Sequence, residues 1–487
     1  MSTDNKVFAS TGWAFAAECA AKIVVPVTNM ILARILAPEV FGIVVTINMV
    51  ISFAEVFTGA GFQKYLIQHD FESDESLNRA SDIAFWVNFG ISIIALTFIG
   101  LFNESIASLV GSEGYGIAIV VASLSLPLQS LSCIYEGLNQ RKFNFRLLFI
   151  IRVMVCFVPL FVTVPLALAG LGYWALIMGT LSGNLLKDVV YICYKRQWFP
   201  SLYFNFEEFK AMFSFGIWTL LEAIVSWSIT WVDVFLISSS LNAYYTGLYK
   251  TAQNTVTSIL SIITASIQPV FFSMLSRCKN DSGLFKDNYL SFVRFSAIFL
   301  VPAGVGMLAY SDFITLILLG KQWMEASQFI GLWSLSIALV CLFGELNREA
   351  YRAIGRPNIS FYVLLSNLLV VIPVCFIAVR GGYHSLTIAR PLAHLEVIIV
   401  HLICTKFLLK IDLSLYFRNI IWPFVSAFVM FGCSMLLKRC FASSLIVDLG
   451  GILICIVVYF SILCISGKYR KLVFGLINDF IHRNNAK

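Results

Sequence analysis

The chain has 487 residues, of which 59% are hydrophobic and only 13% are charged. Soluble domains carry about 25% charged residues, so this composition excludes a string of soluble domains and indicates a protein that lies mostly inside a membrane. The net charge of +7 is mild and does not by itself indicate nucleic acid as a partner. The 12 cysteines form no C-x-x-C pair, which argues against a metal or redox motif of that type and against a disulfide framework.

Apolar runs long enough to cross about 30 Å of hydrocarbon recur along the whole chain, and we count about fourteen of them. The loops between these runs are too short to fold as separate domains. The predicted fold class is therefore an all-α integral membrane protein. In chain order, the centres of the predicted spans lie near Ala21, Val50, Ile93, Leu126, Phe157, Leu181, Ile224, Ile259, Phe299, Leu335, Leu369, Val397, Val425 and Leu453.

Lysines and arginines collect on one side of the predicted membrane. If the N-terminus is cytoplasmic, most of them fall in inner segments, such as Arg141, Lys142 and Arg146 between the fourth and fifth spans. This bias predicts that both termini face the cytoplasm. Beyond residue 466 the chain keeps apolar residues at helical spacing among basic ones. We expect residues 467–487 to form a cytoplasmic amphipathic tail in the headgroup region, with simple disorder as the alternative.

Matched landmarks in the two halves of the sequence indicate an internal duplication, because the separation between partners rises slowly along the chain. The pairs are Gly12 with Gly216, Gly42 with Gly247, Leu138-Asn139 with Leu346-Asn347, and Gly172-Tyr173 with Gly382-Tyr383. We therefore expect a six-helix bundle at 1–197, a second at 213–410, and two further membrane helices at 411–466. Residues 198–212 are predicted to be an amphipathic linker, with an ordinary loop holding buried aromatic residues as the alternative.

Each copy has an even number of spans, so both enter the membrane in the same direction. The two bundles should then be related by a pseudo-twofold axis along the membrane normal and enclose a central cavity. Rocking of the bundles, with local bends at prolines inside the spans, would open this cavity alternately to either side.

Polar residues lie along single faces of four predicted spans, since positions i, i+4, i+7 and i+11 share one face of a helix. Ionisable groups inside hydrocarbon must face a cavity or a partner. We therefore predict that these faces line a water-filled cavity that binds a substrate or a coupling ion. The predicted cavity residues are Glu18, Lys22, Asn29, Asn48, Glu55, Glu222, Asp233, Lys250 and Asn254.

Several of these residues have simpler interpretations. Glu18 and Lys22 could only neutralise each other as an i, i+4 pair, and Glu55 could be a solvated residue at a helix end. Arg152 and Arg294 lie where basic loops enter the fifth and ninth spans. They could contact a phosphate that arrives from the cytoplasmic leaflet, or serve as positive-inside anchors.

No motif for an energy source or for catalysis occurs. The two Gly-Lys pairs lack the earlier glycine and the following hydroxyl of a phosphate-binding loop. No outer loop carries a nucleophile, base and orienting group, so we expect a protein that is not an enzyme. His394 and His401 have no third ligand at suitable spacing, so we expect no metal site. We expect no cofactor, although buried carboxylates such as Glu222 and Asp233 could titrate with coupled protons or bind a sodium ion.

Five segments of the sequence resemble bacterial polysaccharide flippases of the Wzx type, within the superfamily that also holds multidrug exporters and lipid II flippases. The segments are Ala33–Gly42, Gly59–Gln68, Gln140–Phe145, Asp233–Ile237 and Ala353–Pro357. The resemblance covers nearly the whole chain. It does not extend to which glycan is carried.

This resemblance implies translocation of an undecaprenyl-pyrophosphate-linked oligosaccharide from the cytoplasmic to the periplasmic leaflet of the inner membrane, for a surface polysaccharide such as lipopolysaccharide or exopolysaccharide. The implied partners are the lipid-linked oligosaccharide, membrane lipids, and a polysaccharide polymerase with its chain-length regulator, and they include no nucleic acid. Lys22 and Lys250 are the expected contacts to pyrophosphate or sugar, because an ammonium pairs with a moving anion without fixed geometry. The alternatives are a cation-coupled multidrug exporter and a non-transporting scaffold for a polymerase.

Overall fold

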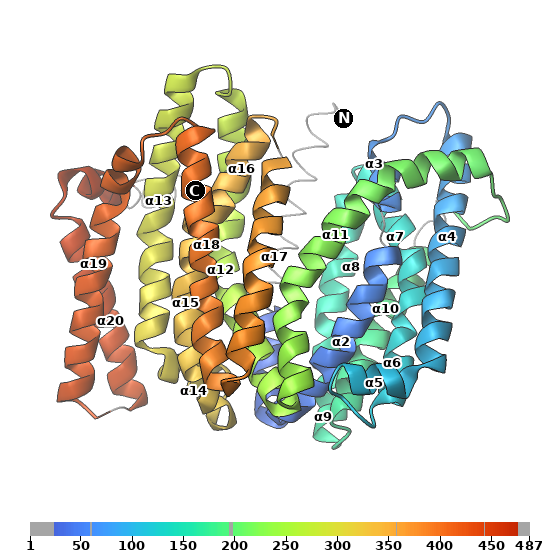
Figure 1. Ribbon diagram of the computed structural model, residues 1–487, viewed down its shortest axis with the longest axis horizontal. Coiled ribbons are helices and arrows are strands. Elements are labelled where there is room, and N and C mark those ends of the chain that lie inside the picture. The colour runs from blue at the N-terminus through green and yellow to red at the C-terminus, as the bar shows by residue number, and fades with distance from the viewer. Residues whose placement is uncertain (1–23, 59–60, 194–197, 357, 443, 476–487) are drawn as a thin grey trace, which may run out of the picture. The chain divides into compact units, whose positions relative to one another are not determined.

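The computed structural model describes residues 24–58, 61–193, 198–356, 358–442 and 444–475 (Figure 1). Within these ranges every regular element is a helix. Among the described residues, thirteen helices are long and apolar enough to cross a membrane, and a shorter apolar helix, Val24–Ile35, precedes them. Every predicted span centre from Val50 onward falls inside one of the thirteen, which confirms the all-α membrane fold. The first predicted centre, Ala21, lies outside the described residues.

The helices follow one another with short connections, and several spans are built from consecutive pieces. In chain order they are α2 (Pro38–Thr58), α3 (Phe62–Gln68), α4 (Asp74–Leu101), α5 (Asn103–Leu109), α6 (Gly116–Ser123), α7 (Ser125–Arg141), α8 (Phe145–Val158), η1 (Pro159–Thr163), α9 (Val164–Leu168), α10 (Tyr173–Cys193), α11 (Phe206–Ser240), α12 (Ala243–Arg277), α13 (Ser282–Ala309), α14 (Ser311–Leu318), η2 (Lys321–Ala326), α15 (Ser327–Val340), η3 (Cys341–Glu345), α16 (Leu346–Ala353), α17 (Asn358–Val379), α18 (Gly382–Phe407), α19 (Leu413–Cys440) and α20 (Leu445–Leu463).

Two compact units make up the described chain. The first holds the described residues up to Thr251 together with Cys375–Tyr383, and the second holds Ala252–Val374 together with the described residues from His384 onward. The division falls inside α12, α17 and α18, so α11 belongs to the same unit as the helices before it. The predicted limits of the two bundles, the linker and the added helices stay predictions.

The core of the first unit forms where α7 packs against α3, α4 and α10. The rings of Tyr135 and Tyr191 stack at 5.4 Å between centroids. The Tyr135 hydroxyl donates to the carbonyl oxygen of Trp198 at 2.6 Å, and the Trp198 indole donates to Asp82 Oδ1 at 2.8 Å. These bonds fix the extended segment before α11 against α4 and α7. The second part of the predicted linker already belongs to α11, which Asn205 caps.

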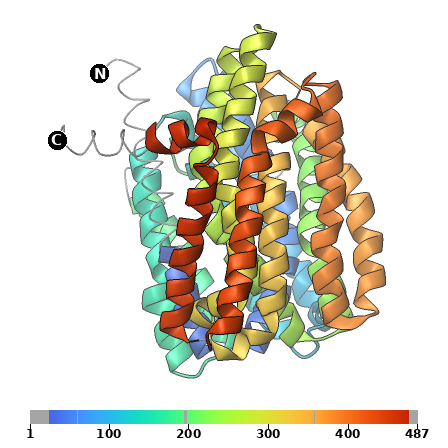
Figure 2. The same cartoon turned by 90° about the vertical axis from the view of Figure 1, so that its left-hand side faces the viewer.

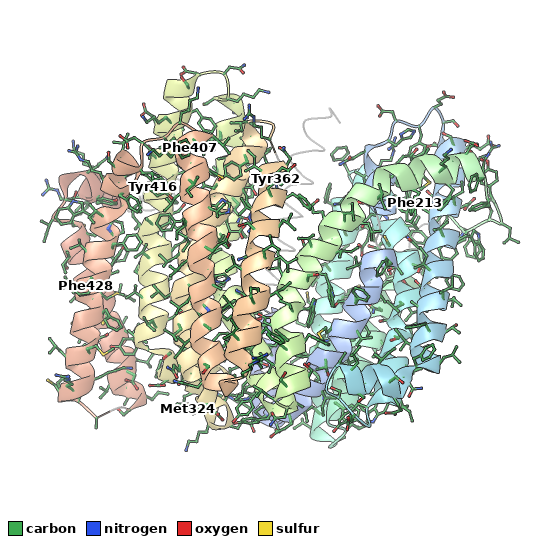
Figure 3. All side chains as sticks on the ribbon, viewed as in Figure 1. Phe213, Met324, Tyr362, Phe407, Tyr416 and Phe428 are labelled. Atoms are coloured by element: carbon green, nitrogen blue, oxygen red, sulfur yellow. The ribbon has the colours of Figure 1, made fainter. Side chains whose placement is uncertain are left out.

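The core of the second unit forms where α13 packs against α15 and α19, and α19 lies beside α20 (Figures 1 and 2). Tyr416 is buried in this core, whereas Phe407 and Phe428 project from the outer surface of their helices (Figure 3). Exposed aromatic side chains on membrane spans are suited to contact with lipid tails. Residues 467–475 are helical. The side chain of Tyr469 is only 2% exposed, so the predicted tail begins with a turn packed on the protein.

One duplicated landmark makes the same local bond in both places. The side-chain amide of Asn139 donates to the carbonyl oxygen of Tyr135 at 2.8 Å, and that of Asn347 donates to the carbonyl oxygen of Phe343 at 2.5 Å. Both asparagines are buried and both bond the residue four positions earlier. The sequence match therefore corresponds to a shared local structure, while the pseudo-twofold relation of whole bundles stays a prediction.

Candidate functional site

The predicted polar face of α2 turns partly towards neighbouring helices of the first unit. The indole nitrogen of Trp227, on α11, donates to Ser52 Oγ at 3.0 Å, and the Trp227 ring lies 4.8 Å from that of Phe53. Glu55 is half-buried, and its Oε1 accepts a hydrogen bond from Gln129 of α7 at 2.5 Å. The Glu55 carboxylate is therefore hydrogen-bonded to a neighbouring helix within the first unit.

Asp233 and Lys250, two of the predicted cavity residues, lie at the contact between α11 and the start of α12. Asp233 is only 1% exposed, and its Oδ2 accepts a hydrogen bond from the Tyr249 hydroxyl at 2.7 Å. Lys250 is also buried. Its Nζ donates to the carbonyl oxygen of Thr230 at 3.4 Å and lies 4.6 Å from the ring centroid of Trp231. Both charged groups thus contact polar or aromatic groups, as a low-dielectric interior requires.

Four other predicted cavity residues that the structure describes are exposed. Asn29, Asn48 and Glu222 are exposed on the first unit, and Asn254 is exposed on the second. Glu18 and Lys22 lie outside the described residues. The prediction that the whole set lines one shared cavity therefore stays a prediction.

A pocket of about 380 Å³ opens between α7, α8 and α10 of the first unit and contains Arg152. Lys187 Nζ lies 3.0 Å from Glu136 Oε1, and both side chains remain partly exposed, at 20% and 32%. Gln140 adds a polar group, and the remaining lining is mostly apolar. The lining carries two cations and one carboxylate. A small excess of positive charge in a partly enclosed space favours an anionic ligand such as a phosphate group.

The buried carboxylate of Asp188, next to Lys187 in the chain but outside the pocket lining, accepts a hydrogen bond from Ser132 Oγ. Of these charged residues, only Arg152 is a predicted site residue; Glu136, Lys187 and Asp188 are not among the predicted contacts. These three residues could have been found by the criterion that identified Glu222, because each is an ionisable residue inside a predicted span. The pairing itself was hidden, because Glu136 and Lys187 come from different helices.

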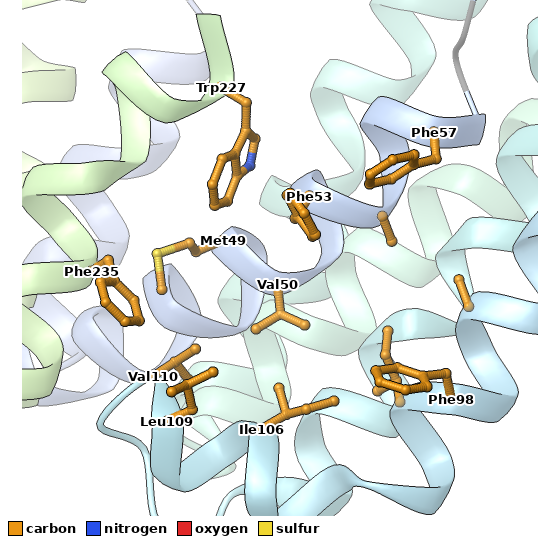
Figure 4. A pocket seen from close by; sticks show the side chains of 13 residues that line it. Met49, Val50, Phe53, Phe57, Phe98, Ile106, Leu109, Val110, Trp227 and Phe235 are labelled. Atoms are coloured by element: carbon orange, nitrogen blue, oxygen red, sulfur yellow. The ribbon is translucent and has the colours of Figure 1, made fainter. Parts of the chain in front are cut away.

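A second pocket of the first unit, of about 440 Å³, is almost entirely apolar (Figure 4). Trp227 and Phe235 from α11 face it from one side, and Phe53 and Phe57 from α2 face it from another. Residues of α4 and α5, such as Phe98, complete it. Such a lining cannot replace the hydrogen bonds that a sugar makes to water, but it suits a hydrocarbon chain.

Arg294, the other predicted phosphate contact, lies in the second unit. Its guanidinium donates to Asn419 Oδ1 at 3.2 Å from Nε and 2.6 Å from Nη2. The two arginines are thus placed in separate units and have different surroundings. Elsewhere in the second unit, Arg390 donates to His394 Nε2 at 3.0 Å, and Glu396 accepts from Ser366 and Asn367.

Comparisons with known proteins relate the chain to polysaccharide assembly. A family model described as polysaccharide biosynthesis protein matches residues 31–328. The chain is 23% identical over 393 residues to the teichuronic acid biosynthesis protein TuaB of Bacillus subtilis, covering 79% of this chain and 80% of that one. It is 21% identical over 384 residues to the lipopolysaccharide biosynthesis protein WzxC of Escherichia coli, covering 78% and 76%.

A solved structure of the lipid II flippase MurJ, in an inward closed conformation, has a similar fold. The TM-score is 0.74 at 16% sequence identity, and the match covers 94% of this chain and 99% of that one. At this identity the likeness establishes the fold.

Proposed function

This chain belongs to the polysaccharide biosynthesis protein family, and from that premise we propose that it is a flippase for a lipid-linked oligosaccharide. The cargo is an undecaprenyl-pyrophosphate-linked repeat unit, which moves from the cytoplasmic to the periplasmic leaflet of the inner membrane. A glycan cannot cross about 30 Å of hydrocarbon unaided, because its hydroxyls would lose water without replacement hydrogen bonds. The polyprenyl tail can stay in lipid throughout.

The observation that carries this proposal is the positively charged pocket between α7, α8 and α10. Arg152 and Lys187 line it with a single carboxylate, that of Glu136. A pyrophosphate carries several acceptor oxygens and negative charge, and it would draw Lys187 away from Glu136 while Arg152 binds it through parallel N–H groups. An exporter of organic cations would require the opposite balance of charge. The pocket therefore favours the oligosaccharide cargo over the multidrug exporter.

The apolar pocket between α2, α4, α5 and α11 supports the same cargo, because a polyprenyl tail needs a surface without polar groups. Its lining is aromatic and aliphatic, with Trp227 Nε1 already bonded to Ser52. We assign this pocket to the first isoprene units of the tail. A cargo with a charged head and a hydrocarbon tail would then meet two kinds of surface on one unit.

The remaining roles belong to the same proposal. Alternating access between two bundles moves the head, with both termini in the cytoplasm, and Glu222 or Asp233 couples the cycle to a proton or a sodium ion. A polymerase and its chain-length regulator receive the product outside. The further candidate contacts to the cargo are Glu18, Lys22, Asn29, Asn48, Glu55, Lys250 and Asn254.

Deletion of the gene followed by complementation tests the function. The deletion strain should accumulate lipid-linked repeat units that remain in the cytoplasmic leaflet, and the wild-type gene should restore surface polymer. The double variant Arg152→Gln with Lys187→Gln should restore little polymer at normal protein level. Lys142→Gln is the matched control, because Lys142 is an exposed basic residue at the end of α7 that does not line the pocket. Full surface polymer in the deletion strain would contradict the proposal.

A further inference from the structure

Several positively charged side chains lie close together at one end of the second unit, where the helical segment 467–475 contacts α19. Asn419 Oδ1 accepts from Arg294 Nη2 at 2.6 Å and from Lys468 Nζ at 2.9 Å. Asn419 is only 6% exposed, and its Nδ2 donates to the carbonyl oxygen of Leu415 at 2.8 Å. Two cations therefore lie within hydrogen-bond distance of one neutral oxygen atom. A neutral amide can satisfy their donors but cannot neutralise their charge.

The ion pairs found within the described ranges include neither of these cations, nor the neighbouring Arg418. Burial lowers the pKa of the Lys468 ammonium, and the charges of Arg294 and Arg418 lower that pKa further. The three cationic groups are thus close enough to repel one another. Such a cluster is normally compensated by an anion.

Exposed charged and apolar side chains lie together around the cluster. Lys468 and Arg418 are exposed, so a ligand can reach their charged groups. Lys468 lies just beyond the end of α20, and Arg418 lies in the second turn of α19. Both positions are at the ends of apolar spans. Two nearby apolar side chains, those of Phe417 and Ile465, are 45% and 71% exposed. Hydrocarbon-facing and charged groups therefore adjoin here, as at the level of lipid headgroups.

We propose that Arg294, Arg418 and Lys468 bind the phosphodiester head of an anionic membrane phospholipid, and that this lipid holds the helical segment 467–475 against α19. Basic pockets between membrane helices on the cytoplasmic side characteristically take such headgroups. The Tyr469 hydroxyl already donates to the carbonyl oxygen of Asn419, so the start of the tail is placed beside the site. This role differs from transport of the cargo, and it gives Arg294 a resident lipid as its ligand.

Binding of defined lipids to the purified full-length protein tests the proposal. The probes are dioleoyl phosphatidylglycerol and dioleoyl phosphatidylcholine, titrated at low salt in detergent and followed by native mass spectrometry. We expect the anionic lipid to bind more tightly, and Lys468→Gln to weaken its affinity about fivefold, the value for one charge near a membrane surface. The matched control is Arg470→Gln, because Arg470 is exposed on the same short helix but makes no contact with Asn419. That variant should keep wild-type affinity.

A second variant, Asn419→Asp, provides the missing negative charge inside the protein. It places a carboxylate between Arg294 and Lys468, so the preference for the anionic lipid should disappear while the protein still folds. If this variant fails to fold, the exposed Lys468→Gln variant still decides the matter. Equal affinity of the wild type for both lipids, or an unchanged affinity after Lys468→Gln, would overturn the proposal.

Two further probes separate the possible sources of the phosphate. Inorganic phosphate that binds as tightly as phosphatidylglycerol would identify a site for a free anion and overturn the lipid assignment. The second probe is undecaprenyl pyrophosphate. If Lys468→Gln weakens the binding of this compound but not that of phosphatidylglycerol, the cluster binds the cargo, and the lipid assignment is overturned. These measurements involve no transport, so the flippase proposal can fail while this one stands, and the reverse also holds.

Discussion

Gly42 and Gly247 occupy matching positions in a reciprocal contact between α2 and α12. A β-carbon on Gly42 would overlap the carbonyl oxygen of Ala243, the first residue of α12, and a β-carbon on Gly247 would overlap the carbonyl oxygen of Pro38, the first residue of α2. Each glycine thus lies against the start of the other helix. A self-complementary contact of this kind is what a local twofold relation produces. Gly42 and Gly247, which the sequence comparison matches between the two halves, are thus in contact through their helices.

The close approach of these helices predicts that either glycine resists even an added methyl group. Gly42→Ala and Gly247→Ala should each destabilise the protein by about 1–3 kcal/mol, because the new atom meets backbone, which cannot rotate away. Thermal unfolding in detergent measures this. Gly90→Ala in α4 is the control, since a β-carbon there meets nothing within 4 Å, and it should be neutral or slightly stabilising. Equal melting temperatures for all three variants would contradict the close contact.

The Asp82 carboxylate predicts a second stability effect, because it accepts hydrogen bonds from the Trp198 indole and from the backbone N–H of Ser201. Asp82→Ala should leave the buried indole N–H without its acceptor and cost about 1–3 kcal/mol. Asp70→Ala removes an exposed carboxylate and should change the melting temperature little. An Asp82→Ala variant as stable as the wild type would show that the segment before α11 is not held by these bonds.

The Glu136–Lys187 ion pair predicts non-additive effects on stability. Lys187→Gln leaves the Glu136 carboxylate partly buried without its cation, so this single variant should be less stable than the double variant with Glu136→Gln. The expected coupling energy is about 0.5–3 kcal/mol. A double-mutant cycle by thermal or chemical unfolding measures it. Strictly additive effects would mean that the two groups do not interact in the membrane.

The apolar pocket predicts a transport defect from added bulk. Ala95 lines the pocket and is half-buried, so Ala95→Phe should fill part of the space without exposing a polar group. We expect the variant to fold and to restore at most about a tenth of the surface polymer, the effect of losing one or two kcal/mol of tail binding. Ala169→Phe, at an exposed alanine beyond α9, should restore wild-type levels. A normal amount of surface polymer in the Ala95→Phe variant would contradict the assignment of the polyprenyl tail to this pocket.

Much of the fold could be predicted from the sequence, because the thickness of hydrocarbon imposes a minimum length on every span. The run around Leu369, for example, is apolar throughout and corresponds to α17. The family could also be predicted, since the segments that resemble polysaccharide flippases lie mostly within the residues that the family model matches. These properties depend on local composition and order, which a single sequence displays directly.

The contacts of charged side chains could not be predicted in the same way. Glu55 finds its partner in Gln129, which lies 74 positions away, and Arg294 meets Asn419, which lies 125 positions away. Helical spacing tells which residues share a face, but it does not tell which other helix packs against that face. Glu222 and Asp233 have the same signal in the sequence, yet only Asp233 is buried.

The most direct test of the central claim is transfer of a labelled lipid-linked oligosaccharide between leaflets of proteoliposomes that contain the purified protein. We predict transfer that depends on the protein and falls about tenfold or more in the double variant Arg152→Gln with Lys187→Gln, the loss expected for a charge-assisted hydrogen bond. Transfer no faster than in protein-free vesicles, at full reconstitution of folded protein, would contradict the claim.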